Sequence, residues 1–241
     1  MALAAAMAVA QRRFMALHQS YGRRLLAAQD EERAAVAREV HDDAVQRLAI
    51  LRHELSLLES EGGVMTEAQH RRLAGLEGEI GDLSDSLRQL AHRLHPATLD
   101  YGHLGLAFEQ LAEEMDRVHG VEVALDAADA GLVRNPAQAL ALFRIAQESL
   151  RNVARHASSR QARLSVRRDD GGIVMLVEDT GRGFDPEAGR KGGATGNGGL
   201  GLYTIRERAR LAGGEATITA RPGAGTTVRV TLPPGEETRR A

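Results

Sequence analysis

The stretch Asp179-Thr180-Gly181-Arg182-Gly183 comes at the end of the apolar run Ile173–Val177. The run predicts a buried strand, so Asp179 would lie where that strand ends and the chain turns. A carboxylate at such a position can accept a charge-assisted hydrogen bond from the exocyclic amino group of adenine. Gly181 and Gly183 allow close backbone approaches that other residues do not, and the ring of Phe184 could pack beneath a base. Taken alone, the pattern also occurs in ordinary turns.

A helical pattern from Pro136 to Ala157 precedes this strand and carries Glu148 and Asn152 four residues apart, on one face. The carbonyl oxygen of Asn is a ligand suited to Mg²⁺, which keeps several waters and is completed by substrate phosphates. Asn152 is therefore the candidate metal ligand, and Glu148 could polarise a metal-bound water or accept a proton. Two solvated side chains on a helix surface would give the same pattern.

Glycines crowd the segment before a helix predicted at Leu200–Leu211. They are Gly192, Gly193, Gly196, Gly198, Gly199 and Gly201. Glycines that open onto a helix N-terminus can form a phosphate cradle from backbone N–H groups and the helix dipole. The polar run 187–197 would suit a lid, although any single glycine here could belong to a flexible surface loop. The spacing fits neither a P-loop nor an early G-x-G-x-x-G of a βαβ unit.

The remaining patterns predict an α+β sandwich, with helices on one face of a mixed sheet. Strands are predicted at Val121–Leu125, Ala162–Arg167, Ile173–Glu178, Glu215–Ala220 and Thr226–Leu232. Helices are predicted at Leu106–His119, Pro136–Ala157 and Leu200–Leu211. Glycine-containing turns at 169–172 and 221–225 mark two hairpins.

Composition narrows the classes of function. The 241 residues suffice for two modest domains, and a hydrophobic fraction of 43% is ordinary for a globular protein. With a net charge of -2 and 3% aromatic residues, the chain has neither the positive field nor the stacking surfaces that favour nucleic acid, so we do not expect a nucleic-acid partner. The absence of Cys excludes thiolate chemistry and fits a cytoplasmic location.

The N-terminal part is predicted to be a helical hairpin. Apolar spacings of three and four predict helices from about Ala4 to Leu58 and from about Thr66 to Leu94, joined at Gly62-Gly63. Neither helix can bury its apolar stripe alone, so we expect a dimeric four-helix bundle with a coiled-coil lead-in, although pairing within one chain would also serve. The apolar run Met1–Ala10 is too short to span a bilayer; a helix start, the stub of a removed membrane helix and a signal-like segment remain open.

Within the first helix, His41 and Asp42 are adjacent and Gln46 follows one helical turn after Asp42. A neutral imidazole can act as a nucleophile when one nitrogen is free, and a neighbouring carboxylate can orient the ring and stabilise the cation that forms. In the reverse direction, Asp42 and Gln46 could position a water that attacks an acyl-phosphate. In isolation, such a pair on a charged helix is more often a solvated face.

Taken in order, these pieces resemble the nucleotide-binding boxes of the GHKL superfamily of gyrase-type ATPases, Hsp90 chaperones, MutL and histidine kinases. The boxes correspond to Glu148 with Asn152, to Asp179, Gly181 and Gly183, and to Gly199 and Gly201, followed by Gly225-Thr226. The resemblance implies a Bergerat-type ATP-binding domain. It implies that Asn152 holds Mg²⁺, that Asp179 holds adenine, that Thr226 approaches adenine through water, and that the segment Gly199–Leu202 surrounds the phosphates. Arg155 stands where the kinases often carry Lys before His156, and both are candidate phosphate-side residues.

The helical half narrows the resemblance to the nitrate-sensor and DesK-like subfamily of two-component sensor histidine kinases. The matching stretches are Arg38–Leu51, Leu87–Leu106, Ile145–Ala157 and Arg206-Glu207-Arg208. This resemblance implies a homodimer that autophosphorylates His41 with ATP and Mg²⁺ and transfers the phosphoryl group to an aspartate of a LuxR-like response regulator. It also implies a phosphatase activity through Asp42 and Gln46, and an upstream sensor of unknown kind.

The expected organisation has five parts. They are a signalling helix at 1–29, a dimerisation and phosphotransfer domain at 30–96, a linker at 97–105, an ATP-binding catalytic domain at 106–234 and a disordered tail at 235–241. Two other functions remain open: a GHKL ATPase or serine kinase of the anti-sigma type, and a scaffold that binds ATP without transferring phosphate.

Overall fold

A computed structural model describes residues 22, 24–61, 66–99, 102–169, 172–185 and 198–233. The predicted Met1–Ala10 run, the Gly62-Gly63 turn, the lid at 187–197 and the tail at 235–241 lie outside these residues. The chain divides into two compact units, Met1–Ala97 and Thr98–Ala241. None of the described helices combines the length and the apolar character that crossing a bilayer requires.

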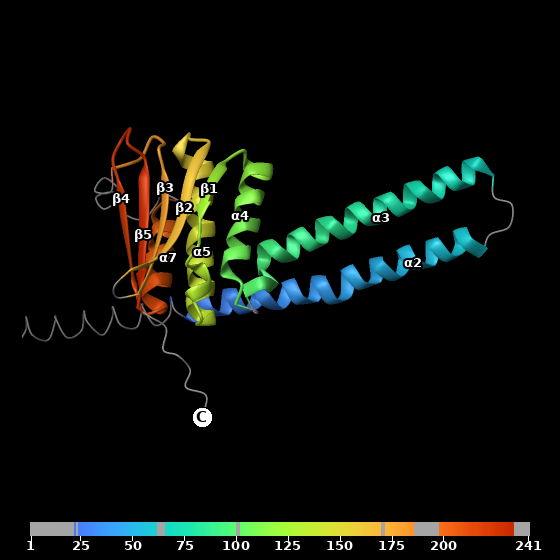
Figure 1. Ribbon diagram of the computed structural model, residues 1–241, viewed down its shortest axis with the longest axis horizontal. Helices are drawn as coiled ribbons and strands as arrows, with labels where there is room; N and C mark the ends of the chain where they lie inside the picture. The colour runs from blue at the N-terminus through green and yellow to red at the C-terminus, as the bar shows by residue number, and fades with distance from the viewer. Residues whose placement is uncertain are drawn as a thin grey trace, which may run out of the picture. The chain divides into compact units, whose positions relative to one another are not determined.

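The first unit is a helical hairpin, as predicted (Figure 1). Its first arm is helical over residues 24–39, continues through a π-helical turn η1 (Val40–Val45) and ends as α2 (Gln46–Glu61). The second arm is α3 (Glu67–Leu94), which contacts both α2 and η1. The sequence pattern predicted an uninterrupted α-helix over the first arm, so the π turn is a correction to that prediction.

Local signals explain both ends of α3. Thr66 and Gln69 form a capping box: the Gln69 N–H donates to the Thr66 hydroxyl, and the Thr66 N–H donates to the Gln69 side chain. At the other end, His95 precedes Pro96 and is extended at φ -157°, because a residue before proline disfavours the helical conformation. The helix therefore starts and stops close to where the sequence predicts.

The second unit is an α+β sandwich, which confirms the predicted class. Its helical elements are α4 (Leu104–His119), the short η3 (Ala130–Leu132), α5 (Pro136–Asn152), the π-helical η4 (Val153–Ala157) and α7 (Gly198–Leu211). Its strands are β1 (Glu122–Asp126), β2 (Gln161–Asp169), β3 (Gly172–Asp179), β4 (Glu215–Ala220) and β5 (Thr226–Leu232). A short turn, η2 (Ala97–Leu99), precedes α4. Both α4 and α7 begin two residues earlier than predicted, and β2 is longer at each end.

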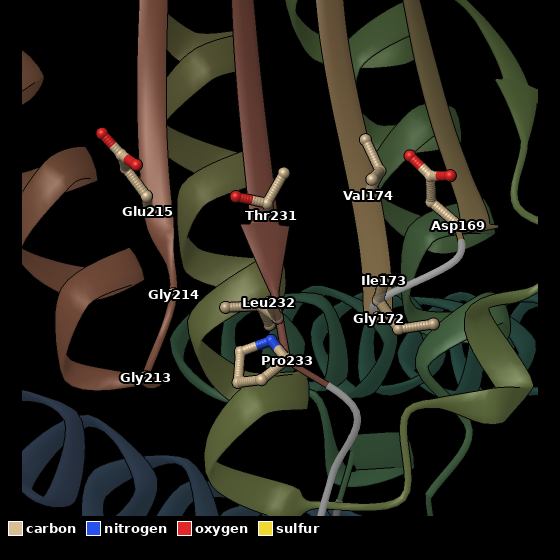
Figure 2. A pocket seen from close by; sticks show the side chains of 10 residues that line it. All are labelled: Asp169, Gly172, Ile173, Val174, Gly213, Gly214, Glu215, Thr231, Leu232 and Pro233. Atoms are coloured by element: carbon tan, nitrogen blue, oxygen red, sulfur yellow. The ribbon is translucent and has the colours of Figure 1, made fainter.

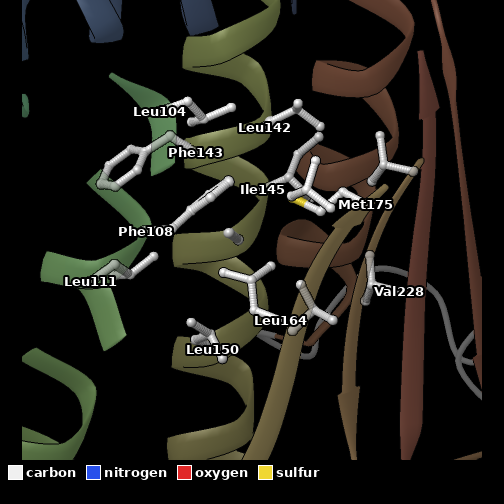
Figure 3. Close-up of a cluster of buried hydrophobic side chains, with 14 of the residues drawn as sticks. Leu104, Phe108, Leu111, Leu142, Phe143, Ile145, Leu150, Leu164, Met175 and Val228 are labelled. Carbon is white, nitrogen blue, oxygen red and sulfur yellow. The ribbon is translucent and has the colours of Figure 1, made fainter. Parts of the chain in front are cut away.

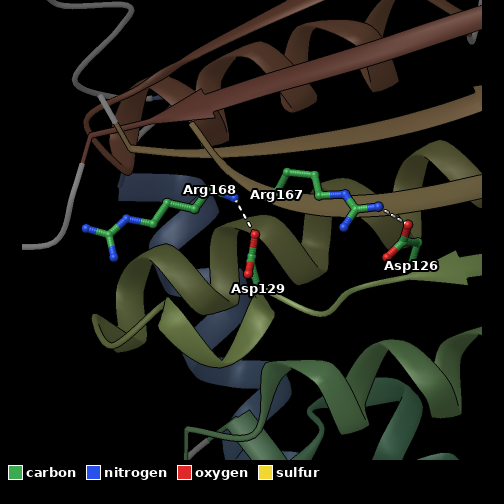
Figure 4. A network of polar contacts seen from close by, with 4 residues as sticks. All are labelled: Asp126, Asp129, Arg167 and Arg168. Atoms are coloured by element: carbon green, nitrogen blue, oxygen red, sulfur yellow. Dashed lines mark hydrogen bonds and ion pairs between the residues drawn. The ribbon is translucent and has the colours of Figure 1, made fainter. Parts of the chain in front are cut away.

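The sheet is mixed, in the order β1-β2-β3-β5-β4. Only the β1–β2 pairing is parallel, and the others are antiparallel. Asp126, which ends β1, and Asp129, which follows the strand, hold this parallel edge through contacts with β2 (Figure 4). Arg167 forms an ion pair with Asp126, and the Arg168 N–H donates to Asp129 Oδ2 at 2.7 Å. The connection from β1 to α5 is thereby fixed against β2.

Helices α4, α5 and α7 cover one face of the sheet, and the core lies between these layers (Figures 1 and 3). Phe108 of α4 and Phe143 of α5 stack with ring centroids 6.5 Å apart, and both are buried. The sheet contributes aliphatic and Met side chains, including Leu164, Met175 and Val228. This burial fixes α5 on the sheet and so determines where its polar residues lie.

Candidate functional site

The site begins at the C-terminal end of β3. Asp179 is directly opposite Thr226 of β5 in the antiparallel register. The Gly181 N–H donates to Asp179 Oδ1 at 2.8 Å, which fixes the half-buried carboxylate. The second carboxylate oxygen is thereby left to accept a bond from another donor. The predicted candidates Asp179, Gly181 and Thr226 therefore lie together at one corner of the sheet.

Backbone hydrogen bonds join this corner to the end of η4. The Arg182 N–H donates to the carbonyl of Ala157 at 2.7 Å. A Cβ added to Gly181 would strike the same Ala157, at 2.6 Å from its Cβ, so only glycine permits this approach. The contact places the loop after β3 beside the helical segment that carries Arg155 and His156, whose side chains are both exposed.

A second set of backbone contacts joins the corner to the β4–β5 turn. The Gly223 N–H donates to the Arg182 carbonyl at 2.6 Å. Gly183 has φ +56° and Gly225 has φ +80°, and a Cβ at either residue would collide with backbone, that of Arg221 and of Asp179 respectively. The corner is thus built by close backbone approaches that need glycine at both positions.

The other part of the site lies where α5 meets α7. Glu148 and Asn152 lie on one face of α5, and both are half-buried. A Cβ on Gly201 of α7 would lie 2.6 Å from Glu148 Oε1 and 3.6 Å from Asn152 Nδ2. Gly199 lies in the first turn of α7, and the half-buried Leu202 follows Gly201. The structure therefore brings the predicted polar pair and the predicted glycine segment into contact.

The predicted residues of the first unit are placed by backbone alone. His41 and Asp42 both lie within η1, and their side chains are outside the described part of the structure. Gln46 is the first residue of α2 and is exposed. The roles predicted for these three residues stay predictions.

Two features of the site carry no signal in the sequence. Ala157 takes part through its carbonyl and its small size, and an alanine at a helix end has no distinguishing chemistry. The π conformation of η4 likewise follows a pattern that predicts ordinary α-helix. Ser158, which ends η4, has φ +56°, unusual for a residue other than glycine.

A cavity of about 500 Å³ lies at the opposite end of β3 and β5 (Figure 2). Figure 2 shows Asp169, Val174, Thr231 and Glu215 across its wall, and Gly213, Gly214 and Pro233 close its base. It includes none of the predicted site residues. The corner at Asp179 is the better candidate because the predicted site residues Asp179, Gly181 and Thr226 meet there.

The fold of the second unit is that of the ATPase domains shared by histidine kinases, gyrase and HSP90. Residues 137–236 match the family described as histidine kinase-, DNA gyrase B-, and HSP90-like ATPase. Residues 32–99 match the family HisKA_3, described as histidine kinase. The chain belongs to the histidine kinase family, and the second match confirms its resemblance to the nitrate-sensor and DesK-like subfamily.

The comparisons with individual proteins agree. The chain is 34% identical over 213 residues to the sensor histidine kinase MctS of Rhizobium johnstonii, and this covers 87% of the chain and 45% of MctS. The chain therefore spans about half the length of this relative. The fold is similar to that of the blue-light activated histidine kinase EL346 of Erythrobacter litoralis, with a TM-score of 0.50, 20% identity, and coverage of 81% of this chain and 61% of that chain.

Proposed function

We propose that this chain is an ATP-dependent protein histidine kinase core that autophosphorylates His41 and transfers the phosphoryl group to an aspartate of a LuxR-like response regulator. In the same proposal it also dephosphorylates that regulator. The observation that carries the proposal is the contact of Gly201 with Glu148 and Asn152. It brings the two segments expected to face the phosphates together, in a chain whose helical hairpin carries a histidine next to a carboxylate.

In this proposal the corner at Asp179 receives adenine. The carboxylate, already fixed by the Gly181 N–H, accepts a bond from the exocyclic amino group. Thr226, which is opposite Asp179 in the register, would approach the base through a bridging water. The backbone loop through Gly183 forms the wall beside it.

The phosphates would lie between α5 and α7. Because Gly201 has no side chain, its backbone lies close to Glu148 and Asn152, and the phosphates would be held beside this contact. Asn152 would supply a carbonyl ligand to Mg²⁺, which would neutralise charge on the phosphates. At the N-terminus of α7, the backbone of Gly199, Gly201 and Leu202 would face the phosphates. From η4, the side chains of Arg155 and His156 would approach the same phosphates. Glu148 would accept a proton or orient water.

The histidine would act from η1. Asp42 would orient the ring of His41 and stabilise its cation, and in the reverse reaction Asp42 and Gln46 would position the water. Because catalysis of phosphoryl transfer consists mostly of positioning and charge stabilisation, these groups need only hold the reacting atoms in line.

The hairpin supports a homodimer. Leu76, Leu83 and Leu90 recur every seven residues along α3 and are 44%, 51% and 45% exposed. They flank the stripe of Leu73, Ile80 and Leu87, which is half-buried in the single chain. A second apolar stripe left open at heptad spacing fits a second copy of the hairpin, which would complete a four-helix bundle.

The test is phosphorylation with γ-labelled ATP and Mg²⁺. The expected label is acid-labile and base-stable and disappears in His41→Ala. It persists in His53→Ala, a matched control because His53 is an exposed histidine on α2, three turns away. Label that persists in His41→Ala, or that is acid-stable, would overturn the histidine kinase proposal and favour a serine kinase or another acceptor.

A further inference from the structure

The side-chain hydroxyl of Ser149 on α5 is buried and has no hydrogen-bond partner among the residues that the structure describes. The residue is only 4% exposed. Serine in a helix often donates to the carbonyl four residues earlier, here that of Ile145, but this bond is not formed. Folded proteins pair nearly all buried polar side-chain atoms, either within the chain or with a ligand or ordered water. The hydroxyl of Ser149 therefore calls for a partner from outside the chain.

Ser149 faces the sheet. It belongs to the stripe of α5 that packs on β3 and β5, with members at helical spacings of three and four. The other members of this stripe are the buried residues Leu142, Ile145 and Val153. Glu148, one residue before Ser149, is rotated by about 100° around the helix and faces Gly201 of α7. The two neighbouring side chains thus point into different spaces, Glu148 toward α7 and Ser149 toward the sheet.

The end of the helix shows how far along the sheet Ser149 lies. Because α5 joins the parallel strands β1 and β2, it runs opposite to them and in the direction of β3. The two ends meet where the Arg182 N–H donates to the Ala157 carbonyl. Ser149 precedes Ala157 by eight residues, about 12 Å of helix, and this equals about four residues of strand counted back from Gly181. Ser149 is therefore level with Val177.

The strand residues at this level face the helix. Val177 of β3 and its partner Val228 of β5 belong to the core beneath α5. Asp179 and its partner Thr226 come two residues nearer to the end of the sheet, and strand alternation places them on the same side as the two valines. The hydroxyl of Ser149 therefore lies on the side of the sheet that Asp179 and Thr226 face, next to the corner described above.

We propose that Ser149 is a further residue that determines base specificity, because its hydroxyl donates to the water through which Thr226 would approach adenine. The inference rests on the proposed function, in which Asp179 accepts from the exocyclic amino group. A buried water makes about two to four hydrogen bonds. This water accepts from the hydroxyls of Ser149 and Thr226, and it donates to Asp179 and to ring N1, the atom next to the amino-bearing carbon of adenine.

This arrangement selects one pattern of base. Adenine has an acceptor at N1, whereas guanine and hypoxanthine have an N1–H donor there and a carbonyl in place of the amino group. The water already accepts from two hydroxyls, so it has no lone pair left for a third donor. A site whose polar groups would be left unpaired rejects the wrong ligand strongly. Ser149 thus adds to the preference for ATP over GTP without contacting the base itself.

The test combines a change in the residue with a change in the base. Isothermal titration calorimetry measures the affinity of wild type and Ser149→Ala for ATP and for 1-deaza-ATP, in which C–H replaces N1. Ser149→Ala should weaken ATP binding about 3- to 10-fold, the effect of one neutral hydrogen bond. For 1-deaza-ATP the two proteins should agree within about 2-fold, because the water no longer reaches the ring. Equal losses with both nucleotides would overturn the proposal, since Ser149 would then act through packing.

Thermal unfolding without nucleotide gives a second measurement. Ser149→Ala removes a hydroxyl that has no partner and introduces a better helix former, so the unfolding midpoint should rise by about 2 to 4 °C. A fall in the midpoint would overturn the proposal, because the hydroxyl would then serve the fold. The matched control is Ser165→Ala, which changes a buried serine of β2 on the opposite face of the sheet. This control should leave the affinities for ATP and 1-deaza-ATP as in the wild type.

Failure of this inference can be told apart from failure of the proposed function. If the wild type binds ATP and Asp179→Asn weakens that binding, the nucleotide site stands, and unchanged ATP affinity in Ser149→Ala would then overturn only the role of Ser149. A wild type that binds ATP and 1-deaza-ATP equally would also overturn the role of the water at N1. A wild type that binds no ATP would overturn both the proposed function and this inference.

Discussion

Gly201 of α7 lies so close to Glu148 of α5 that a Cβ on the glycine would approach Glu148 Oε1 to 2.6 Å. The atom that would be struck is the end of a flexible side chain, and the surrounding backbone has room. A methyl group at this position should therefore move the carboxylate and leave the fold intact. Such a variant therefore shows whether glycine is needed at position 201 for function or for folding.

Gly201→Ala is expected to slow autophosphorylation by about 100-fold, because small displacements of a positioning group have effects of that size. The free energy of unfolding should change by less than about 1 kcal/mol, since alanine also favours the helix. Steady-state labelling and urea denaturation measure the two quantities. Gly131→Ala is the control, because a Cβ at Gly131 meets nothing within 4 Å. Equal autophosphorylation rates in Gly201→Ala and Gly131→Ala would show that Glu148 and Gly201 are not part of the site.

Gly225→Ala should destabilise the second unit by about 3 to 4 kcal/mol. Its φ of +80° strains any other residue, and its Cβ would also collide with the Asp179 carbonyl. The control is Gly223→Ala, with a φ of +78° and open space around its Cβ, which should cost only about 1 to 2 kcal/mol. The difference between the two unfolding free energies measures the collision. Equal unfolding free energies in Gly225→Ala and Gly223→Ala would show that the turn backbone moves to relieve the collision.

Asp179→Asn should keep the fold, because the Gly181 N–H can donate to an amide oxygen as well as to a carboxylate. Affinity for ATP should fall roughly 10- to 100-fold, as expected for a hydrogen bond to a charged group. Isothermal titration calorimetry with ATP measures it. Asp169→Asn, which changes the wall of the cavity at the other end of the sheet, should leave the affinity unchanged. A loss of ATP affinity in Asp169→Asn but not in Asp179→Asn would indicate that the nucleotide binds in that cavity instead.

Leu83→Glu should weaken the dimer at least about 100-fold, because it would place a charge in the open apolar stripe of α3. Ala74→Glu introduces the same charge on the opposite side of the helix, where Ala74 is exposed, and should leave the dimer intact. Light scattering after size-exclusion chromatography gives the mass of each variant. A Leu83→Glu variant that stays dimeric would place the interface elsewhere.

Ser158→Gly should stabilise the second unit by up to about 1 kcal/mol, since glycine adopts the left-handed conformation of Ser158 without strain. The neighbouring change, Ser159→Gly, should destabilise it by about 1 kcal/mol, because the Ser159 hydroxyl accepts from the Gln161 N–H at 3.2 Å. Thermal unfolding compares the two variants. A loss of stability in Ser158→Gly would show that the serine side chain is needed at this position.

Most of the architecture could be predicted because each signal was local. Pro96 and the Thr66–Gln69 pair mark the ends of α3, and the apolar run before Asp179 gives β3 and the position of its carboxylate. The family resemblance then gave the order in which the pieces of the site combine, and the family matches confirm the class.

The unpredicted features depend on winding and on backbone contacts. Residues 40–45 contain no proline or glycine, so nothing in their propensities distinguishes a π turn from an α turn. The carbonyl of Ala157 has no side-chain signature either. The parallel pairing of β1 with β2 joins segments separated by α5, and the ion pair of Asp126 with Arg167 is visible only once the strands are paired.

The corner beside Asp179 is held largely by backbone groups from residues 157, 182, 221 and 223. In evolution, such a corner can keep its form while the exposed side chains of Thr180, Arg182 and Arg221 drift freely. In a saturation library we expect near-complete tolerance at these three positions beside strict intolerance at Gly181, Gly183 and Gly225. Related chains could then change the charge around this corner, and with it the molecules that approach, while the backbone that forms the corner stays the same.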